Sequence, residues 1–432
     1  MKIAVIGSGI SGASAAAGLA GHAQVTLFEA DHRLGGHSHT VDVSLPDHTG
    51  QAVTHGVDTG FLVFNPRTYP RLVALFNQLQ VPVADADMSF SVQAPGWADG
   101  EALEWSGHDL STVFAQRSNL LRPRFWGMLS DIVRFNRLCT GLAVNGDAEA
   151  NLRPLGEFLD KHRFGPVFRD GYLLPMLGCI WSCPTDQMLQ FPVATMVRFC
   201  HNHGLLQVNN RPQWKTVAGG SREYVKRLLA PVADIRLGTP VQQVLREGHL
   251  VNVVTHHGTE QFDHVVIASH SDQTLAMLAH PTPTERAVLG AIRYQPNVAV
   301  LHTDASVLPS RKAAWAAWNY ERTTPAGQSS ASVCLHYLIN RLQPLPFAQP
   351  VIVSLNPVRD IRAETVLARI DYAHPVFDAD AIRAQRHVDA IQGTGGVWFC
   401  GAWTGYGFHE DGLRSGQRVV DRLLANAQRM AA

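Results

Sequence analysis

Short apolar runs alternate with a small-residue segment at the start of the chain. Lys2 to Ile6 is a β-branched run that ends at a glycine, Ser11 to Ala20 is rich in alanine, and Gln24 to Glu29 is a second apolar run. Five or six mostly apolar residues in a row are typical of a buried strand, whereas the longer segment has the length and composition of a helix. The pattern therefore predicts a β-α-β unit, the building block of a parallel sheet.

The pattern changes along the rest of the chain. Residues 85–215 predict a mostly helical segment with scattered aromatic residues, residues 237–269 contain paired strand-like runs, and residues 285–390 mix such runs with short helices. Residues 397–403 predict a strand and a turn, and residues 411–424 predict an apolar helix. Together these segments predict an α/β protein with a Rossmann-like domain and a second domain of mixed sheet and helices.

Composition excludes several functional classes. The 432 residues suffice for two to three domains at roughly 150 residues each. The 36 Lys and Arg balance the 36 Asp and Glu, and charged residues make up 17% of the chain, so bulk charge does not favour a nucleic-acid partner. No apolar run reaches the roughly 18 residues of a membrane span. The six sparse cysteines favour a reducing, cytoplasmic setting.

A glycine-rich turn connects the first predicted strand to the first predicted helix. Gly7, Gly9 and Gly12 form G-x-G-x-x-G, and Glu29 ends the second strand. The first glycine permits a tight turn, the second lets backbone N–H groups approach a pyrophosphate, and the third lets helix and strand pack closely. The glutamate can accept hydrogen bonds from an adenosine ribose. This arrangement predicts a bound dinucleotide.

A second glycine-rich turn, Arg33-Leu34-Gly35-Gly36-His37, favours FAD over NAD because it adds a guanidinium and free N–H groups near the same diphosphate. The combined E-x-x-x-R-x-G-G pattern resembles the FAD-dependent amine oxidase and phytoene desaturase superfamily. The resemblance implies that the helix opening at Asp411 caps the flavin. On these grounds we expect cofactor contacts from Gly7, Gly9, Ile10, Ser11, Gly12, Glu29, Ala30, Arg33, Gly35, Gly36, His37, Gly60, Phe61, Val241, Gly401, Asp411, Gly412 and Leu413.

Longer stretches are similar to the flavin domain associated with cyclopropane fatty acid synthases and to its bacterial stand-alone relatives, a family of NAD/FAD-binding proteins. They include GFLVFNPRTYP (Gly60 to Pro70), RPQWKTVAGGSREYV (Arg211 to Val225) and FHEDGLRSG (Phe408 to Gly416). The resemblance implies a fatty acyl substrate and a cyclopropane synthase-type methyltransferase as partner. The domains expected are a discontinuous FAD-binding domain (1–70, 215–280 and 396–432) and a discontinuous substrate domain (71–214 and 281–395).

His409 bears on the reaction. It lies three residues before Gly412, where the resemblance places an aromatic cage residue of amine oxidases, and this departure argues against an amine substrate. His409 and Glu410 are our candidate catalytic residues, for proton transfer during C–H cleavage or double-bond migration. The alternative is structural: His409 holds the turn, and Glu410 caps the helix. The residues expected to line the substrate are Trp181, Trp214, Trp403 and Tyr406.

The function expected is that of an FAD-dependent oxidoreductase. A hydride would pass from an unsaturated or modified acyl chain to flavin N5, so that the chain is dehydrogenated or isomerised. The alternatives are a flavin amine oxidase and a non-catalytic FAD-binding scaffold for the methyltransferase.

Other cysteines and histidines have two interpretations each. Cys179 and Cys183 form either a redox pair or, as we favour, buried thiols. His201 and His203 suggest polar lining and not a metal site, because no carboxylate or cysteine lies at ligand spacing, and no metal is expected. His37 and His39 flank the second glycine turn and either attach covalently to the flavin or, as we favour, are positioned beside the diphosphate.

The segment from Leu120 to Leu138 combines apolar residues at near-helical spacing with four arginines and one aspartate. A basic amphipathic helix that includes Trp126 would rest on anionic lipid, which gives peripheral contact with the inner membrane face. The alternative, which we favour slightly, is an ordinary helix with a solvated arginine face.

Overall fold

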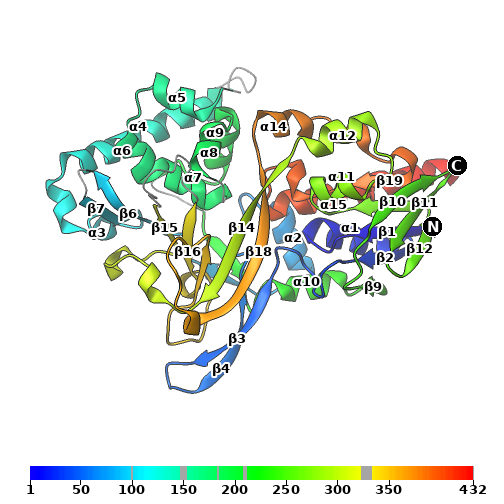
Figure 1. The fold of residues 1–432 in the computed structure, drawn as a ribbon, viewed down its shortest axis with the longest axis horizontal. Helices are drawn as coiled ribbons and strands as arrows, with labels where there is room; N and C mark the ends of the chain where they lie inside the picture. The colour runs from blue at the N-terminus through cyan, green and yellow to red at the C-terminus, as the bar shows by residue number, and fades with distance from the viewer. Residues whose placement is uncertain (99–100, 146–152, 182–183, 208–211, 323–332, 432) are drawn as a thin grey trace.

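The computed structural model describes residues 1–432 apart from 99–100, 146–152, 182–183, 208–211, 323–332 and 432 (Figure 1). Both chain termini lie beside a parallel sheet at one end of the molecule. A larger, mostly antiparallel sheet runs through the middle towards a group of helices at the other end.

The predicted β-α-β unit is confirmed. β1 (Lys2–Ile6) and β2 (Gln24–Phe28) pair in parallel, and α1 (Ile10–Ala20) connects them. Later segments extend this sheet in the order β19-β13-β1-β2-β9. They are β9 (Asp234–Arg236), β13 (His264–Ile267) and β19 (Val397–Phe399).

Alternate residues of β1 bury both faces of this sheet. Ile3 and Val5 pack with α1 and with α15 (His409–Ala431), whereas Ala4 and Ile6 pack on the other side. That side is covered by an antiparallel sheet of β10 (Gln243–Glu247), β11 (Leu250–Thr255) and β12 (Gly258–Phe262). Burial on both faces explains why the strands read as continuous apolar runs.

The central sheet has seven strands in the order β18-β14-β17-β16-β15-β6-β7. Its members are β6 (Phe90–Ala98), β7 (Glu101–Ser106), β14 (Arg293–His302), β15 (Trp318–Glu321), β16 (Cys334–Leu338), β17 (Ile352–Leu355) and β18 (Val366–Val376). Residues 85–215 were expected to be mostly helical, and β6 and β7 correct this expectation for the part before residue 107. The strand pattern was hidden because Ser91 and Gln93 point inward, where they donate hydrogen bonds to Asn319 Oδ1 and the Val307 carbonyl.

Helices make up most of the described residues between 107 and 207 and share one core with the central sheet. They are α3 (Leu110–Val113), η1 (Arg117–Leu121), α4 (Pro123–Asn145), α5 (Leu155–Lys161), α6 (Pro166–Phe168), η2 (Arg169–Leu173), α7 (Leu174–Trp181), α8 (Thr185–Leu189) and α9 (Val193–Asn202). Most of the amphipathic segment predicted from Leu120 to Leu138 lies in α4, whereas Leu120 and Leu121 belong to η1.

The remaining elements connect the two sheets. A hairpin of β3 (Thr40–Pro46) and β4 (Ala52–Asp58) projects from the body (Figure 1). The strands β5 (Val83–Ala86) and β8 (Trp214–Val217) pair with each other. The other helices are α2 (Pro70–Gln78), α10 (Arg222–Leu229), α11 (Ser271–Met277), α12 (Pro283–Gly290), η3 (Ala305–Val307), η4 (Lys312–Ala314), α13 (Ile339–Leu342), η5 (Ala363–Thr365), α14 (Ala379–Gln385), η6 (Val388–Ile391), η7 (Thr394–Gly396) and η8 (Ala402–Thr404).

The expected domain boundaries stay a prediction. Across the part of the chain that the structure describes, no helix is both long enough and apolar enough to cross a bilayer.

Candidate cofactor and substrate site

The turn between β1 and α1 has a shape that lets a ligand approach its backbone closely. Gly7 has a φ of +98°, which favours glycine, and a Cβ on Gly12 would lie 1.9 Å from the Gly7 carbonyl oxygen. No side chain caps α1 at Gly9, and its first turn contains no acidic residue. The first N–H groups of the helix therefore lack side-chain partners and can receive a diphosphate.

Glu29 lies next to this turn. Its Oε2 accepts hydrogen bonds from the Ser8 amide (2.8 Å) and hydroxyl (2.5 Å), and its Oε1 accepts one from the Asp31 amide (2.9 Å). These bonds fix the carboxylate at the carboxyl end of β2, the position from which it can meet a ribose. Val241 follows a segment anchored to the same strand end, since the Thr239 amide donates to the Glu29 carbonyl at 2.8 Å.

The second glycine turn lies on the first. Gly35 and Gly36 have φ values of +106° and +57°, and a Cβ on Gly36 would lie 3.1 Å from the Gly9 Cα. Arg33 Nη1 donates to the Gly36 carbonyl at 2.7 Å, which holds the guanidinium beside both turns. The Nε2 atom of His37 is buried without a hydrogen-bond partner among the described residues. A buried ring nitrogen without a partner fits a polar group of a ligand.

The start of α15 meets the start of α1. A Cβ on Gly412 would lie 2.7 Å from Ile10 Cγ2 and 2.9 Å from Ser11 Oγ. Asp411 orders the preceding loop, because its Oδ2 accepts the amides of Tyr406 (3.0 Å) and Phe408 (3.3 Å). Two helix N-termini thus converge, which suits the anionic diphosphate and the electron-rich edge of a reduced flavin.

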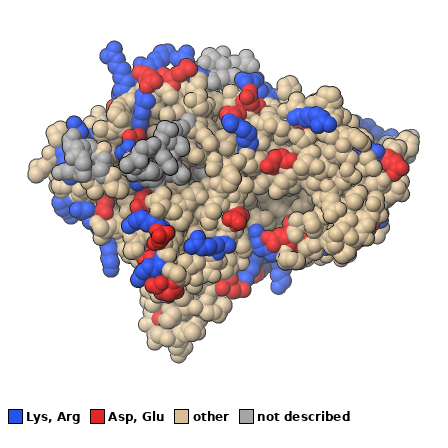
Figure 2. Space-filling model, viewed as in Figure 1, with Lys and Arg blue, Asp and Glu red and all other residues tan. Residues whose placement is uncertain are grey.

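The surface is hollowed between β18 and the helices of the parallel sheet (Figure 2). The remaining predicted cofactor residues lie close to the glycine turns or at element ends. A Cβ on Gly60 would lie 2.3 Å from the His37 carbonyl oxygen, and the Phe61 amide donates to that oxygen at 2.7 Å. Gly401 follows β19, and its amide donates to Ser415 Oγ at 3.0 Å. Ala30 is exposed at the end of β2, and Leu413 is buried in α15. The set fits FAD.

The His409 ring stacks on the Phe61 ring, with the two centroids 3.7 Å apart. Its Nε2 lies 2.9 Å from Ser38 Oγ and 3.1 Å from the Tyr224 hydroxyl, and these two hydroxyls also contact each other. Burial lowers the pKa of His409 to about 3. The ring is therefore neutral near pH 7, and this environment favours a positioning role over proton donation.

Glu410 faces another helix. Its two carboxylate oxygens each accept a backbone amide, from Arg71 and Leu72, at 3.0 Å. Both amides belong to the first turn of α2, whose own N-cap makes no side-chain hydrogen bond. Glu410 therefore caps α2, not the helix that contains it, and this contact favours a structural role over a catalytic one.

Histidines separated in sequence meet beside the second glycine turn. The centroid of the His37 ring lies 5.3 Å from that of His374 and 6.3 Å from that of His270. The His37 ring also stacks on the Tyr372 ring, with centroids 4.8 Å apart. Burial, and then the neighbouring His374 and His270, lower the pKa of His37 well below its ordinary value. Burial also lowers the pKa of His374 to about 4. The cluster is polar and uncharged at neutral pH. Sequence reasoning missed His270 and His374 because no local motif marks them.

An aromatic cluster surrounds Phe199 on α9. Its ring stacks on His203 (3.8 Å) and Phe408 (4.9 Å), and it lies 4.7 Å from Trp181 and 5.9 Å from Tyr406. Three of the four predicted substrate residues belong here, since Trp214 stacks on His203 at 6.2 Å. The fourth is Trp403, which packs with the residues of β1 and β13 that face the three-stranded sheet.

The charged side chains at this aromatic cluster include two arginines. Burial raises the pKa of Tyr406, and the neighbouring Arg198 guanidinium acts to lower it. Arg67 lies near His203, and it contributes, after burial, to lowering the pKa of that histidine to about 4. The cluster therefore combines apolar walls with positive charge.

The other cysteines and histidines have structural surroundings. Burial raises the pKa of the Cys179 thiol well above its ordinary value, which argues against a reactive thiolate, and Cys183 lies outside the described residues. His203 Nδ1 bonds the Phe199 carbonyl at 2.9 Å, one helical turn back, and His201 lies in the last turn of α9. His39 Nδ1 contacts the Tyr372 hydroxyl at 3.3 Å.

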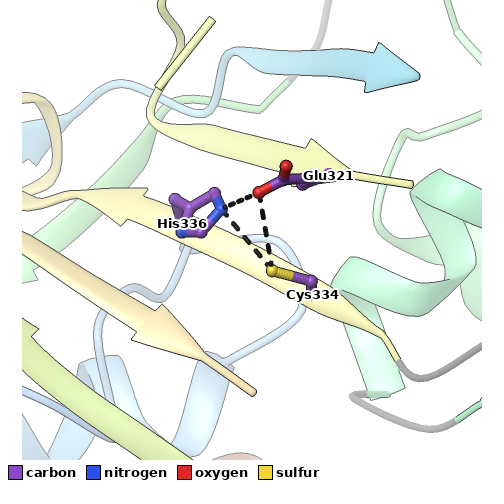
Figure 3. A group of neighbouring side chains, drawn as sticks. All are labelled: Glu321, Cys334 and His336. Atoms are coloured by element: carbon purple, nitrogen blue, oxygen red, sulfur yellow. Dashed lines mark hydrogen bonds and ion pairs between the residues drawn. The ribbon is translucent and has the colours of Figure 1, made fainter. Parts of the chain in front are cut away.

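A separate buried group lies on β15 and β16 (Figure 3). Glu321 Oε2, Cys334 Sγ and His336 Nε2 converge, with the carboxylate 3.0 Å from the ring nitrogen. These atom types can bind zinc. Here Arg359 pairs with Glu321 at 2.9 Å and Ser354 Oγ lies 2.6 Å from His336 Nδ1. The charge is thus balanced and both ring nitrogens have partners, so we interpret the group as a structural network of the sheet.

Comparisons with known proteins agree with this geometry. Residues 10–331 match the model of a family described as flavin containing amine oxidoreductase. The chain is also 28% identical to (S)-6-hydroxynicotine oxidase of Paenarthrobacter nicotinovorans over 268 residues, which cover 61% of this chain and 59% of that protein. The chain thus spans about three fifths of the length of this curated relative.

Solved structures share the fold over nearly the whole chain. A CLA-producing fatty acid isomerase from P. acnes superposes with a TM-score of 0.66 at 16% identity, covering 97% of this chain and 98% of that one. Cyclohexylamine oxidase from Brevibacterium oxydans gives a TM-score of 0.65 at 14% identity and covers 99% of both chains.

Proposed function

The chain belongs to the flavin-containing amine oxidoreductase family and is an FAD-dependent oxidoreductase, and from this premise we propose that its substrate is an unsaturated or modified fatty acyl chain. The reaction proposed is dehydrogenation or double-bond isomerisation. Bound FAD would accept two electrons in dehydrogenation, and in isomerisation it would accept a hydride and return it to the chain.

One observation carries this proposal: the aromatic cluster around Phe199 is apolar, and the charge beside it is positive. An acyl chain would bury its methylenes against the rings, and each buried CH₂ is worth about 0.8 kcal/mol. Arg198, next to Tyr406, offers a guanidinium to a carboxylate head group. The substrate's chain and its charge thus have separate complementary partners.

Two carboxylates near this cluster, those of Asp411 and Glu410, already have hydrogen-bond or ion-pair partners within the protein. Asp411 accepts two loop amides and pairs with Arg414 at 2.8 Å. Glu410 accepts the first amides of α2. A cationic amine would therefore find neither Asp411 nor Glu410 free to neutralise it, and it would lie near the positive charge of the arginines. Burying an unpaired charge is costly.

The fatty acid isomerase from P. acnes supports the proposal, because its fold covers nearly all of this chain. Within the site, the aromatic side chains would exclude water from the reacting carbon, and the neutral His409 would hold Ser38 and Tyr224 in place. A methyltransferase partner stays a prediction from sequence.

Oxidation of a small amine is the second candidate. The 28% identity with (S)-6-hydroxynicotine oxidase favours it, as does the fold shared with cyclohexylamine oxidase. The position expected for a cage aromatic holds His409 instead, and its ring is packed against Phe61.

The test is anaerobic mixing of the purified flavoprotein with an unsaturated fatty acid and, separately, with an alkylamine of the same chain length. We expect the fatty acid to bleach the flavin absorbance or to yield a product with a new or displaced double bond, detected by mass spectrometry. Bleaching by the amine alone would establish the second candidate and contradict the first.

Arg198→Ala sharpens this test. We expect the KM for the free fatty acid to rise about tenfold, in line with loss of a charge-assisted hydrogen bond, and the KM for its methyl ester to be unchanged. Arg286→Ala on α12 is the matched control, because that arginine is exposed and lies outside the cluster. An equal effect on acid and ester would argue against a head-group role for Arg198.

A further inference from the structure

Exposed apolar side chains are concentrated in one part of the helical region. Among the described residues, twelve large apolar side chains are exposed, and six of them lie within residues 110–144, about a twelfth of the chain. Scattered exposed leucines and valines are ordinary, whereas a concentration of them marks an interaction surface. We call this set the apolar tip, and its members are Leu110, Leu120, Leu121, Trp126, Val133 and Val144.

The first part of the apolar tip is continuous in space. The Trp126 indole N–H donates to the Leu120 carbonyl at 3.0 Å, and the Trp126 ring lies 5.4 Å from Phe114, one turn beyond Leu110. Leu110 and Leu121 are 79% and 88% exposed, respectively, so both project into solvent. The short helices α3 and η1 and the start of α4 thus present one apolar surface.

The second part follows the outward face of α4. At 100° per residue, Trp126, Val133, Arg137 and Val144 fall within about 40° of one another around the helix axis. The opposite face carries Phe135 and Met128, which are buried in the core. Val133 is 52% exposed and Val144 68%, so the stripe is open along the helix.

The apolar tip lies in a basic setting. Residues 110–144 contain five arginines, at 117, 122, 124, 134 and 137, and a single acid, Asp131. Arg134 pairs with that aspartate at 2.9 Å, which leaves a net charge of +4 on the segment. α3 and α4 occupy the end of the molecule opposite the two termini (Figure 1), and basic side chains project from that end (Figure 2).

We propose that the apolar tip docks the protein on a membrane that contains anionic lipids, with α4 lying along the bilayer surface. Projecting leucines and a tryptophan suit the acyl and headgroup layers, and each nearby arginine adds roughly 1 kcal/mol of attraction to an anionic surface, equivalent to about fivefold in binding. A protein partner is less well matched. It would need a groove for the protruding side chains and acidic residues for the arginines, whereas a bilayer surface covers such side chains without a shaped site.

Docking would also bring lipid close to the proposed acyl site, and in this respect the inference rests on the proposed function. α4 packs against α9, and the Phe199 ring of α9 belongs to the aromatic cluster. The membrane-facing helix and the cluster are thus separated by a single helix.

The test uses vesicles that cannot serve as substrate. Wild-type protein is sedimented with vesicles of saturated phosphatidylcholine, with and without saturated phosphatidylglycerol. Because these lipids have no double bond, the result does not depend on the proposed chemistry. We expect binding only to the anionic vesicles, falling as salt rises.

Leu121→Asp and Arg137→Glu should each lower the vesicle partition coefficient about tenfold or more, because one loses apolar insertion and the other reverses a charge. Leu367→Asp on β18 is the control, since Leu367 is also exposed but lies outside the segment. Equal binding of all four proteins would overturn the proposal. So would concentration-dependent dimerisation that Leu121→Asp abolishes, because the tip would then be covered by a second copy.

Discussion

His409 carries no charge at neutral pH, because its ring is packed on Phe61 and its Nε2 faces the hydroxyls of Ser38 and Tyr224. At the residue scale, the site is built from such uncharged polar groups. His37 and His374 are also held neutral by burial, which lowers the pKa of each. Neutral rings can orient a ligand by hydrogen bonds without competing with the arginines for an anionic group.

This neutrality gives a pH prediction. Between about pH 5.5 and about 8.5 we expect His409→Gln to leave the pH profile of flavin reduction unchanged in shape, because a group with a pKa of about 3 does not titrate there. Stopped-flow absorbance would measure the rate, with whichever substrate class reduces the flavin. His48→Gln, in the exposed β3–β4 hairpin, controls for removal of any imidazole. If one side of the pH–rate profile disappeared in the His409 variant alone, the conclusion that His409 stays neutral in this pH range would be wrong.

At the element scale, α1 and α15 are held together by small residues. A Cβ on Gly416 would lie 2.2 Å from Ser14 Oγ and 2.3 Å from the Ser11 carbonyl oxygen. The helices can approach closely only because the side chain is absent, and their approach brings the two helix starts to the cofactor position.

We expect Gly416→Ala to destabilise the protein by about 2 kcal/mol and to lower FAD content, because the added methyl group forces α15 away from α1. Gly141→Ala in α4 is the matched control, since a Cβ there meets nothing within 4 Å. It should stabilise the fold by about 0.5 to 1 kcal/mol, the ordinary helix preference for alanine. Urea unfolding followed by circular dichroism would measure both, and the same sign for both variants would contradict this packing argument.

Sequence reasoning located elements whose apolar pattern is continuous. The predicted β1 has the observed bounds, and β2 ends one residue earlier than predicted. α15 begins at His409, two residues before the predicted start. The strands β6 and β7 were missed, because buried polar residues that pair across the sheet do not produce an apolar alternation. Periodicity therefore locates what packs by hydrophobic contact and misses what packs by hydrogen bonds.

The residues of the candidate site also fall into two groups, those that sequence could identify and those that only the fold reveals. The glycine turns and Glu29 follow a local spacing and could be identified from sequence. The histidine cluster, the capping of α2 by Glu410 and the position of Trp403 depend on segments hundreds of residues apart. Only the assembled fold determines which of these side chains meet.

At the scale of the whole molecule, Asp58 joins three regions. Its buried carboxylate accepts hydrogen bonds from Thr40 Oγ1 (2.6 Å), the Ser221 amide (2.9 Å) and Gln343 Nε2 (2.8 Å). These partners belong to β3, to the start of α10 and to the segment after α13. Burial nevertheless raises the pKa of Asp58 from 3.8 to about 6, against the lowering effect of its donors.

The raised pKa predicts a loss of stability as pH increases. Between about pH 4 and about pH 6, the unfolded carboxyl is ionised while the folded one keeps its proton, so the free energy of unfolding falls by about 3 kcal/mol from this group. Asp58→Asn lacks this contribution. We therefore expect the wild type to lose stability relative to the variant from pH 4 to pH 7, as measured by urea unfolding. Parallel pH curves for the two proteins would contradict the prediction.

The order of strands in the parallel sheet also determines when the sheet can form during synthesis. β1 and β2 are synthesised well before β9, β13 and β19, which complete their sheet only after residue 399, and α15 follows them. At roughly 5 to 20 residues per second, the nascent chain waits on the order of 20 to 80 seconds before both helix starts exist. During that interval the apolar faces of β1 and β2 lack their final neighbours. The cofactor can therefore contact both helix starts only after residue 409 has been synthesised.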